Sequence, residues 1–249
     1  MKTLLSIVMM VIVSASMYGQ TILKEGYLRY FESTTRTFGN GNVSKESAIH
    51  TMAFSPQYFK IVTEPKKGVM HTVLSDFSNK TSTNYITNFD QYYKLQNEQY
   101  APALFSLGQY NTVDPVISLR PDTATIGKYK CRKAVLSFLL AEERDSVKME
   151  VWYLPDAKIQ CDDVKHPFNK LEGLPVQFSF VRKPMTRFIG TMSSLTEVVY
   201  TLKTFTGATP VDVAKIRDIQ KYTTIETDEL ARRVLEINGS PHPERMTDK

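Results

Sequence analysis

The sequence predicts a mainly β protein, in which a curved antiparallel sheet or half-barrel of about ten strands is covered by a C-terminal helix. Three observations lead to this fold class. Short runs rich in Tyr, Phe, Val, Ile and Thr follow one another from residue 21 to about residue 203, turn residues separate them, and helical periodicity is nearly absent there. We therefore expect residues 21–239 to form a single β-rich domain.

The expected strands are separated by clear turn signals, such as Gly-Asn-Gly-Asn at 39–42 and Pro-Lys-Lys-Gly at 65–68. Val176, Phe178 and Phe180 alternate with polar residues, as in a strand with one apolar face, and that face needs a cover. The candidate strands are 27–31, 58–63, 72–74, 82–87, 91–95, 128–139, 147–154, 176–181, 187–192 and 195–203.

Helical patterns are confined to the end of the chain, at about 210–238. Pro210 is a suitable first helical residue, and Thr227 is a suitable N-cap for a second helix over 227–237. The second helix carries an apolar stripe made of Leu230, Val234 and Ile237, which predicts that it covers the sheet. The charged tail 240–249 is expected to be disordered.

The first twenty residues have the pattern of an export signal. One basic residue, Lys2, precedes the apolar run 4–13, and small residues follow at 14–16 before Gln20. At about ten residues this run is too short for a transmembrane helix, which needs roughly 20. The sequence therefore predicts cleavage of residues 1–20 and a mature chain that is periplasmic or secreted and not transmembrane.

Composition and charge exclude several classes of protein. Hydrophobic residues make up 42% of the chain and charged residues 23%, which is ordinary for a globular protein and excludes a fibrous one. The net charge is +5, with basic residues scattered among acidic ones. Such a distribution favours mild attraction to anionic surfaces and does not indicate a nucleic-acid partner.

Two cysteines, Cys131 and Cys161, lie in the predicted mature part. An even pair in an oxidising compartment favours a disulfide, which would stabilise the fold by about 3.5 kcal/mol on the chain-entropy model. The alternative is two separate buried thiols, and only geometry can decide between them.

Motifs for catalysis and cofactor binding are absent from the sequence. There are four histidines but no phosphate loop, dinucleotide fingerprint, acyl-transfer elbow or HExxH motif, so we expect neither an enzyme nor a cofactor. Asp162, Asp163 and His166 have the donor groups for a divalent cation. A solvated polar loop explains these three residues better, and no metal site is predicted.

Three segments carry a family resemblance: Ile-Gly-Lys-Tyr-Lys-Cys-Arg-Lys-Ala at 126–134, Glu-Val-Trp-Tyr-Leu-Pro-Asp at 150–156 and Leu-Glu-Gly-Leu-Pro-Val-Gln-Phe at 171–178. Together they resemble the exported GLPGLI family of Bacteroidetes and the exported proteins grouped with the lipoprotein carrier LolA. The sequence departs from the name motif after Pro175. The resemblance implies a curved antiparallel sheet and supplies no catalytic residues.

Six residues are candidates for ligand binding. Trp152, on the mixed face of its strand, could stack on a ligand or lie buried under a loop. Gly173, Leu174 and Pro175 could bind a ligand or form a tight turn, with Gly supplying an unusual backbone angle and Pro blocking an edge donor. Leu230 and Val234 could form the lid of a cavity or simply fill the core.

These observations leave two hypotheses for the function. The first is a periplasmic protein that binds or carries a lipid, an acyl chain or another apolar molecule on the concave face of the sheet, with aromatic side chains lining the site. The second is a cell-envelope module that binds another protein through a sheet face or edge. A hydrolase ranks third, because the sequence holds no catalytic signature.

Overall fold

The computed structural model describes residues 20–67, 69–88, 91–95, 103–105, 107, 113–139, 147–161, 163–164, 166–182, 194–207 and 222–225. Within these residues there are fourteen strands and no helix. The predicted export signal, the strand at 187–192 and the tail lie outside them, as does the predicted helical region at about 210–238 apart from residues 222–225, which form a strand. In the described part no helix is long and apolar enough to span a membrane.

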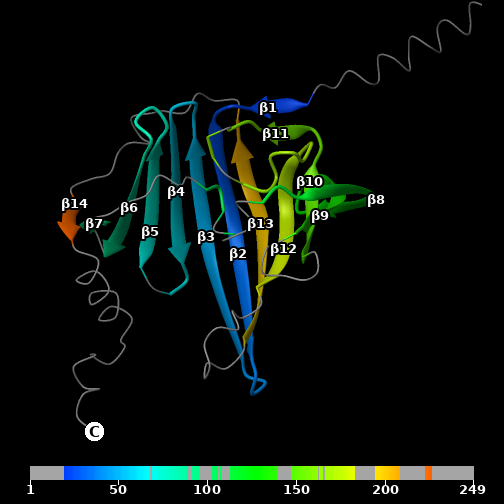
Figure 1. Ribbon diagram of the computed structural model, residues 1–249, viewed down its shortest axis with the longest axis horizontal. Helices are drawn as coiled ribbons and strands as arrows, with labels where there is room; N and C mark the ends of the chain where they lie inside the picture. The colour runs from blue at the N-terminus through cyan, green and yellow to red at the C-terminus, as the bar shows by residue number, and fades with distance from the viewer. Residues whose placement is uncertain are drawn as a thin grey trace, which may run out of the picture.

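Figure 1 shows the strands, which are numbered in chain order. They are β1 (Thr21–Leu23), β2 (Gly26–Phe38), β3 (Val43–Phe54), β4 (Tyr58–Pro65), β5 (Met70–Asp76), β6 (Thr81–Asn88), β7 (Gln91–Leu95), β8 (Val116–Ile126), β9 (Tyr129–Phe138), β10 (Val147–Leu154), β11 (Ala157–Ile159), β12 (Leu174–Arg182), β13 (Ser194–Thr206) and β14 (Tyr222–Ile225).

Twelve of these strands form one sheet in the order β14-β7-β6-β5-β4-β3-β2-β13-β12-β10-β9-β8. All its pairings from β7 to β8 are antiparallel, and only β14 joins in parallel, beside β7. The end strands β14 and β8 do not pair with each other, so the sheet is open. The predicted mainly β class with an antiparallel sheet of about ten strands is confirmed, with twelve strands in the whole sheet.

The sequence pattern did not predict two long strands, β3 and β8, and the reason differs between them. β3 begins with polar and charged residues around Lys45 and Glu46, so its first half lacks apolar alternation. β8 contains Pro121 within an irregular stretch between Leu119 and Thr123, where its register against β9 shifts. Proline is tolerated there because β8 is the edge strand of the sheet.

The long hairpin of β2 and β3 is closed by the predicted turn at 39–42. Gly41 has a φ of 81°, which favours glycine, and the amide of Asn42 donates a hydrogen bond to the Asn40 side chain at 3.0 Å. Figure 1 shows this hairpin extending beyond its neighbours. The figure also shows β8 and β9 running nearly at right angles to β2–β5, as expected of a large twisted sheet.

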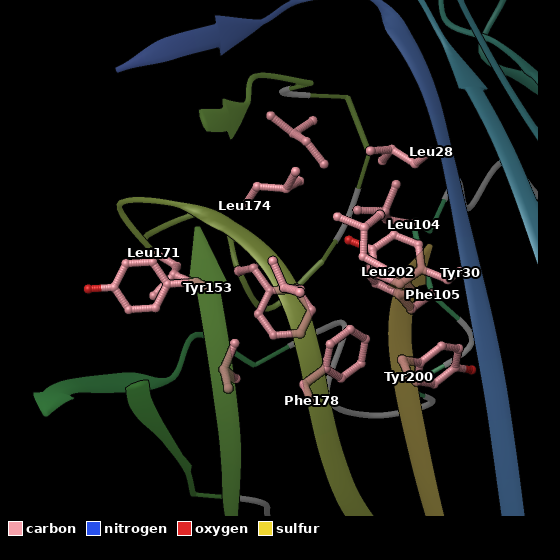
Figure 2. Packing of buried hydrophobic residues seen from close by; sticks show 14 of the residues in the cluster. Leu28, Tyr30, Leu104, Phe105, Tyr153, Leu171, Leu174, Phe178, Tyr200 and Leu202 are labelled. Atoms are coloured by element: carbon pink, nitrogen blue, oxygen red, sulfur yellow. The ribbon is translucent and has the colours of Figure 1, made fainter. Parts of the chain in front are cut away.

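The main core lies on one face of the sheet, which we call the inner face. Val176, Phe178 and Phe180 all face it and are at most 2% exposed, which confirms the alternation seen in the sequence. Figure 2 shows Tyr30, Phe178 and Tyr200 projecting from neighbouring strands toward Phe105 and Leu104. The Phe105 ring is 4.9 Å from that of Phe178 and 5.0 Å from that of Tyr30.

The core has a cover of short segments in the described part. The small parallel sheet of β1 and β11 lies over one end (Figure 1), and Leu23 and Ile159 from these strands are buried in the core. Phe105, Phe168 and Leu171 come from connecting segments and pack into the same core. These segments cover part of the apolar face that the C-terminal helix was expected to cover.

Candidate functional site

A network of polar side chains interrupts the inner face where β2, β3 and β4 meet. The His50 Nε2 atom lies 2.8 Å from the Glu32 Oε2 atom, and the His50 Nδ1 atom lies 3.1 Å from the Thr63 hydroxyl. His71 faces the same side, because it pairs directly with Thr63 across β4 and β5. We call Glu32, His50, Thr63 and His71 the polar row.

Strand register explains how these residues meet. His50 pairs with Tyr30 on β2 and with Thr63 on β4, so three neighbouring strands place their side chains in one line. Glu32 lies two residues beyond Tyr30 on the same face and reaches His50 diagonally. No single stretch of sequence carries this arrangement, since its members come from four strands.

Glu32 is held as a carboxylate by its neighbours. Burial favours the neutral acid, but hydrogen bonds from His50, Tyr200 and Thr34, together with the charge interaction with His50, lower the Glu32 pKa to about 2. The Thr34 hydroxyl donates to Glu32 at 2.8 Å. His71 has no such charged neighbour in the network, and burial lowers its pKa, which keeps the ring neutral at neutral pH.

The polar row marks a boundary on the inner face. On one side, the His50 ring lies 5.4 Å from the Tyr200 ring, which stacks on Phe178 in the packed core. Toward β4 and β5, Thr63, His71, Ile61 and Val73 are only half-buried. We call the inner face of β4 and β5 at these four residues the open half.

The order of groups in the network is hydroxyl, imidazole and carboxylate, as in acyl-transfer enzymes. Thr63, however, lies within β4, which is paired on both sides with β3 and β5. The backbone N–H groups around it therefore belong to the sheet, whereas an oxyanion hole needs donors that are directed at the substrate. The arrangement suits hydrogen bonding to a bound molecule better than catalysis.

Trp152 takes the position expected from the alternation of its strand. It is half-buried and pairs with Lys133 across β9 and β10. The Lys133 ammonium group lies 5.6 Å from the centre of the indole ring and 2.9 Å from the Glu150 carboxylate. Trp152 is thus part of a local cation–π and ion-pair cluster, separate from the polar row.

Gly173, Leu174 and Pro175 have structural roles that differ from the predicted turn chemistry. Gly173 is not among the glycines with positive φ, and a Cβ there would lie 2.2 Å from the Tyr153 ring, so glycine is needed for close approach. Leu174 is fully buried. The Pro175 carbonyl accepts a hydrogen bond from the Tyr30 hydroxyl at 2.6 Å.

The expected role of Pro175 at a sheet edge was wrong. β12 is an interior strand, paired with β10 and β13. Pro175 is tolerated because it lies at a register shift opposite Trp152 and Tyr153, where one backbone donor is not required. Leu230 and Val234, the other two predicted ligand-binding residues, lie outside the described residues.

The predicted disulfide is absent from the structure, which contains no bond between Cys131 and Cys161. The Cys131 thiol is buried in the core and donates a hydrogen bond to the Tyr129 carbonyl at 3.5 Å. Burial raises the pKa of this thiol. Cys161 is half-buried and packs at the margin of the core, so each cysteine occupies an apolar position of its own.

The loop residues considered for a cation do not converge in the described part. Asp163 forms an ion pair with Lys80 at 2.7 Å, and Asp162 lies outside the described residues. His166 is buried beside Phe168, and neither ring nitrogen has a hydrogen-bond partner among the described residues. No group of three His, Cys, Asp or Glu residues that could hold a metal occurs in this part of the chain.

Comparisons with known proteins give a fold likeness at low scores. No protein-family model matches the sequence, and no curated protein matches it. The structure of PNGF-II aligns with 84% of this chain and 33% of its own length, at 14% identity and a TM-score of 0.34. This chain therefore spans about a third of PNGF-II.

Two smaller structures align along most of their length. A DUF1329 family protein from Desulfovibrio piger covers 78% of this chain and 90% of its own, at 10% identity and a TM-score of 0.31. A LolA superfamily protein from Nitrosomonas europaea covers 77% and 90%, at 9% identity and a TM-score of 0.28. Membership of the GLPGLI family is not confirmed.

Proposed function

We propose that this chain is an exported, single-domain binding protein that holds an apolar ligand, such as a lipid or an acyl chain, on the inner face of its sheet. The observation that supports the proposal is the change in burial across that face. The aromatic side chains that β2, β12 and β13 place on this face are buried in the core, whereas Ile61 on β4 and Val73 on β5 stay half-buried.

The open half has the composition of a binding surface. Its apolar side chains continue the core, because Ile61 packs against the main cluster. Its polar groups are few and converge at one place, where Thr63 and His71 lie side by side on the paired strands. Ligand sites in proteins combine a mainly apolar surface with a small number of polar groups that fix orientation.

The export part of the proposal concerns residues 1–20, whose pattern is that of a signal peptide. Intact-mass measurement of protein recovered from outside the cytoplasm should show the loss of about twenty residues. Retention of Met1 in such material would contradict this part of the proposal without bearing on ligand binding.

Binding can be tested with an uncharged fluorescent probe, phenylnaphthylamine, titrated into the purified protein. We expect saturable binding that Val73→Glu weakens about tenfold or more, because a carboxylate would be desolvated against the apolar ligand. Val62→Glu is the matched control. Val62 is also half-buried but alternates to the opposite face of β4.

Mass spectrometry of organic extracts from the purified protein identifies a natural ligand. A lipid that copurifies with the native protein and is depleted from Val73→Glu, but not from Val62→Glu, supports the proposal. If the probe does not bind, or if both variants lose it equally while remaining folded, the inner face is not the binding site.

A second candidate function, a protein-interaction module, is favoured by the edge strand β8. Val116 and Leu119 on β8, together with Leu139 just after β9, are 70%, 62% and 75% exposed. An exposed apolar edge can pair with a strand of a partner protein. Cross-linking from Val116 to one stable partner, together with a clean organic extract, would favour this second function.

A further inference from the structure

We propose that the ligand is an uncharged amphiphile with a hydroxyl group, of the fatty-alcohol or monoacylglycerol type, and that Thr63 and His71 bind this hydroxyl. The inference rests on the proposed function and adds the chemistry of the polar group. It follows from the charges, the hydrogen-bonding capacity and the spacing of side chains on the open half.

The charges on this part of the inner face disfavour an anionic ligand. Glu32 is a carboxylate next to the site, held so by three hydrogen bonds. In the described part of β4, β5 and β6, no lysine or arginine faces the same side, since Lys60 alternates to the opposite face. Arg36 does share this face, but it is paired with Glu46 at 3.2 Å.

The distance to Arg36 adds to this argument. Arg36 is four residues from Glu32 along β2, which corresponds to about 13 Å in a strand. A fatty-acid carboxylate or a phosphate at Thr63 would therefore meet the negative Glu32 with no nearby lysine or arginine among the described residues. Such an arrangement selects against anions.

The hydrogen-bonding capacity of the site matches a hydroxyl group. The Thr63 hydroxyl lies 3.1 Å from the His50 Nδ1 atom, so this contact uses one of its hydrogen-bonding positions. The Thr63 oxygen has two lone pairs, so at least one remains to accept a hydrogen bond from a ligand. A neutral His71 has one N–H donor and one acceptor nitrogen.

A ligand hydroxyl can therefore donate to Thr63 and accept from His71 at the same time. An ester carbonyl can only accept, so it cannot use the Thr63 lone pair. A carboxylate also lacks a proton to donate to Thr63, and it adds the repulsion from Glu32. The expected order of affinity is alcohol, then methyl ester, then acid.

The spacing between successive residue pairs on β4 and β5 provides room for both the hydroxyl group and the apolar chain of such a molecule. Ile61 and Val73 form the next row on the same face, about 7 Å from Thr63 and His71. Beyond them, Phe59 and Ser75 are fully buried and close that end. The apolar chain thus meets Ile61 and Val73 directly beside the polar group.

Competition against bound phenylnaphthylamine at neutral pH tests the inference. Hexadecanol, methyl hexadecanoate and hexadecanoate have chains of the same length and differ in the polar group. We expect hexadecanol to displace the probe at concentrations about tenfold lower than hexadecanoate, which corresponds to about 1.4 kcal/mol. The methyl ester should fall between them.

Two variants assign this preference to the named residues. Thr63→Val removes the acceptor at nearly constant shape. In this variant the alcohol and the ester should displace the probe at about the same concentration. His71→Leu should weaken alcohol and ester together and serves as the second test if Thr63→Val does not fold. Thr51→Val is the control, because Thr51 is half-buried on the outer face of β3.

The outcomes separate this inference from the proposed function. Probe binding with equal or better displacement by hexadecanoate overturns the inference and leaves an apolar-ligand protein. An alcohol preference that survives both Thr63→Val and His71→Leu also overturns it, since the hydroxyl would then be bound elsewhere. Absence of probe binding overturns the proposed function itself.

Discussion

The two halves of the inner face are built from the same kind of strand but differ in what lies over them. In the packed half, formed by β2, β9, β10, β12 and β13, residues such as Val151, Phe178 and Tyr200 are at most 1% exposed. In the open half, Ile61, Thr63, His71 and Val73 remain half-buried. Alternation along a strand is therefore not sufficient to seal a face.

The difference comes from the covering segments. Phe105 contacts Tyr30, Phe178 and Tyr200, and Phe168 contacts Phe178 at 4.7 Å, so aromatic side chains from connecting segments fill the packed half. The polar row stands where this aromatic packing ends. A twisted sheet of twelve strands is wide enough to combine a stabilising core with a separate surface for binding.

The largest expected effect comes from truncating the centre of the packed half. Phe178→Ala should lower the free energy of unfolding by about 3–5 kcal/mol, because it removes a fully buried ring and leaves a cavity among other aromatic rings. Urea denaturation monitored by circular dichroism measures the change.

Phe31→Ala is the control for this prediction. Phe31 is half-buried on the opposite face of β2, where Lys203 lies 5.2 Å from its ring centre. Equal destabilisation by the two substitutions would show that the packed half contributes no more to the free energy of unfolding than the opposite face of β2.

The second prediction concerns the loss of stability at low pH that is caused by the buried His166. Burial lowers the pKa of His166 to about 4, so the folded protein keeps this ring neutral. The unfolded chain takes up the proton near pH 6.5, and stability should therefore be complete above that pH and decline as the pH falls to about 4. The loss corresponds to about 3 kcal/mol.

His166→Phe should remove most of this loss, because phenylalanine fills a similar volume and cannot bind a proton. Urea denaturation at a series of pH values compares the two proteins. Since the pKa of His71 is also lowered, a small residual slope is expected in the variant. Parallel stability profiles for the native protein and the variant would contradict the assignment to His166.

A third prediction examines backbone packing at the edge of the packed half. Gly173→Ala places a Cβ 2.2 Å from the Tyr153 ring and 2.8 Å from the Leu154 carbonyl, so the strand ends must shift. We expect a loss of about 1–3 kcal/mol in the free energy of unfolding. Gly41→Asn is the control, because nothing lies within 4 Å of that position and asparagine tolerates its positive φ.

The sequence predicted the fold class and most central strands because apolar alternation is a local signal. Val176, Phe178 and Phe180 show it clearly, and all three are buried. β3 and β8 were missed because charged residues or Pro121 interrupt their patterns, and pairing with neighbours, not local preference, makes them strands.

The polar row could not be predicted in the same way. Glu32, His50, Thr63 and His71 come from different strands, and only the register of β2 to β5 brings them together. Neither His50 nor His71 lies within a strand predicted from the sequence, so no local signal pointed to them. Gly173, Leu174 and Pro175 were predicted as ligand-binding residues because their local sequence is unusual. In the structure their roles are in packing and hydrogen bonding within the fold.

The smallest expected effect lies in the open half and tests the comparison most directly. Val73→Ala should lower the free energy of unfolding by less than about 1 kcal/mol, because a half-buried valine loses little apolar burial when it is shortened. Val151→Ala, the same substitution at a fully buried position of the packed half, should cost about 2 kcal/mol or more. Phenylnaphthylamine titration should show the reverse order, with weaker probe binding for Val73→Ala and unchanged binding for Val151→Ala in the folded state. Similar stability losses together with unchanged probe binding in both variants would mean that the two halves form one continuous core, and the open half would then have no role in binding.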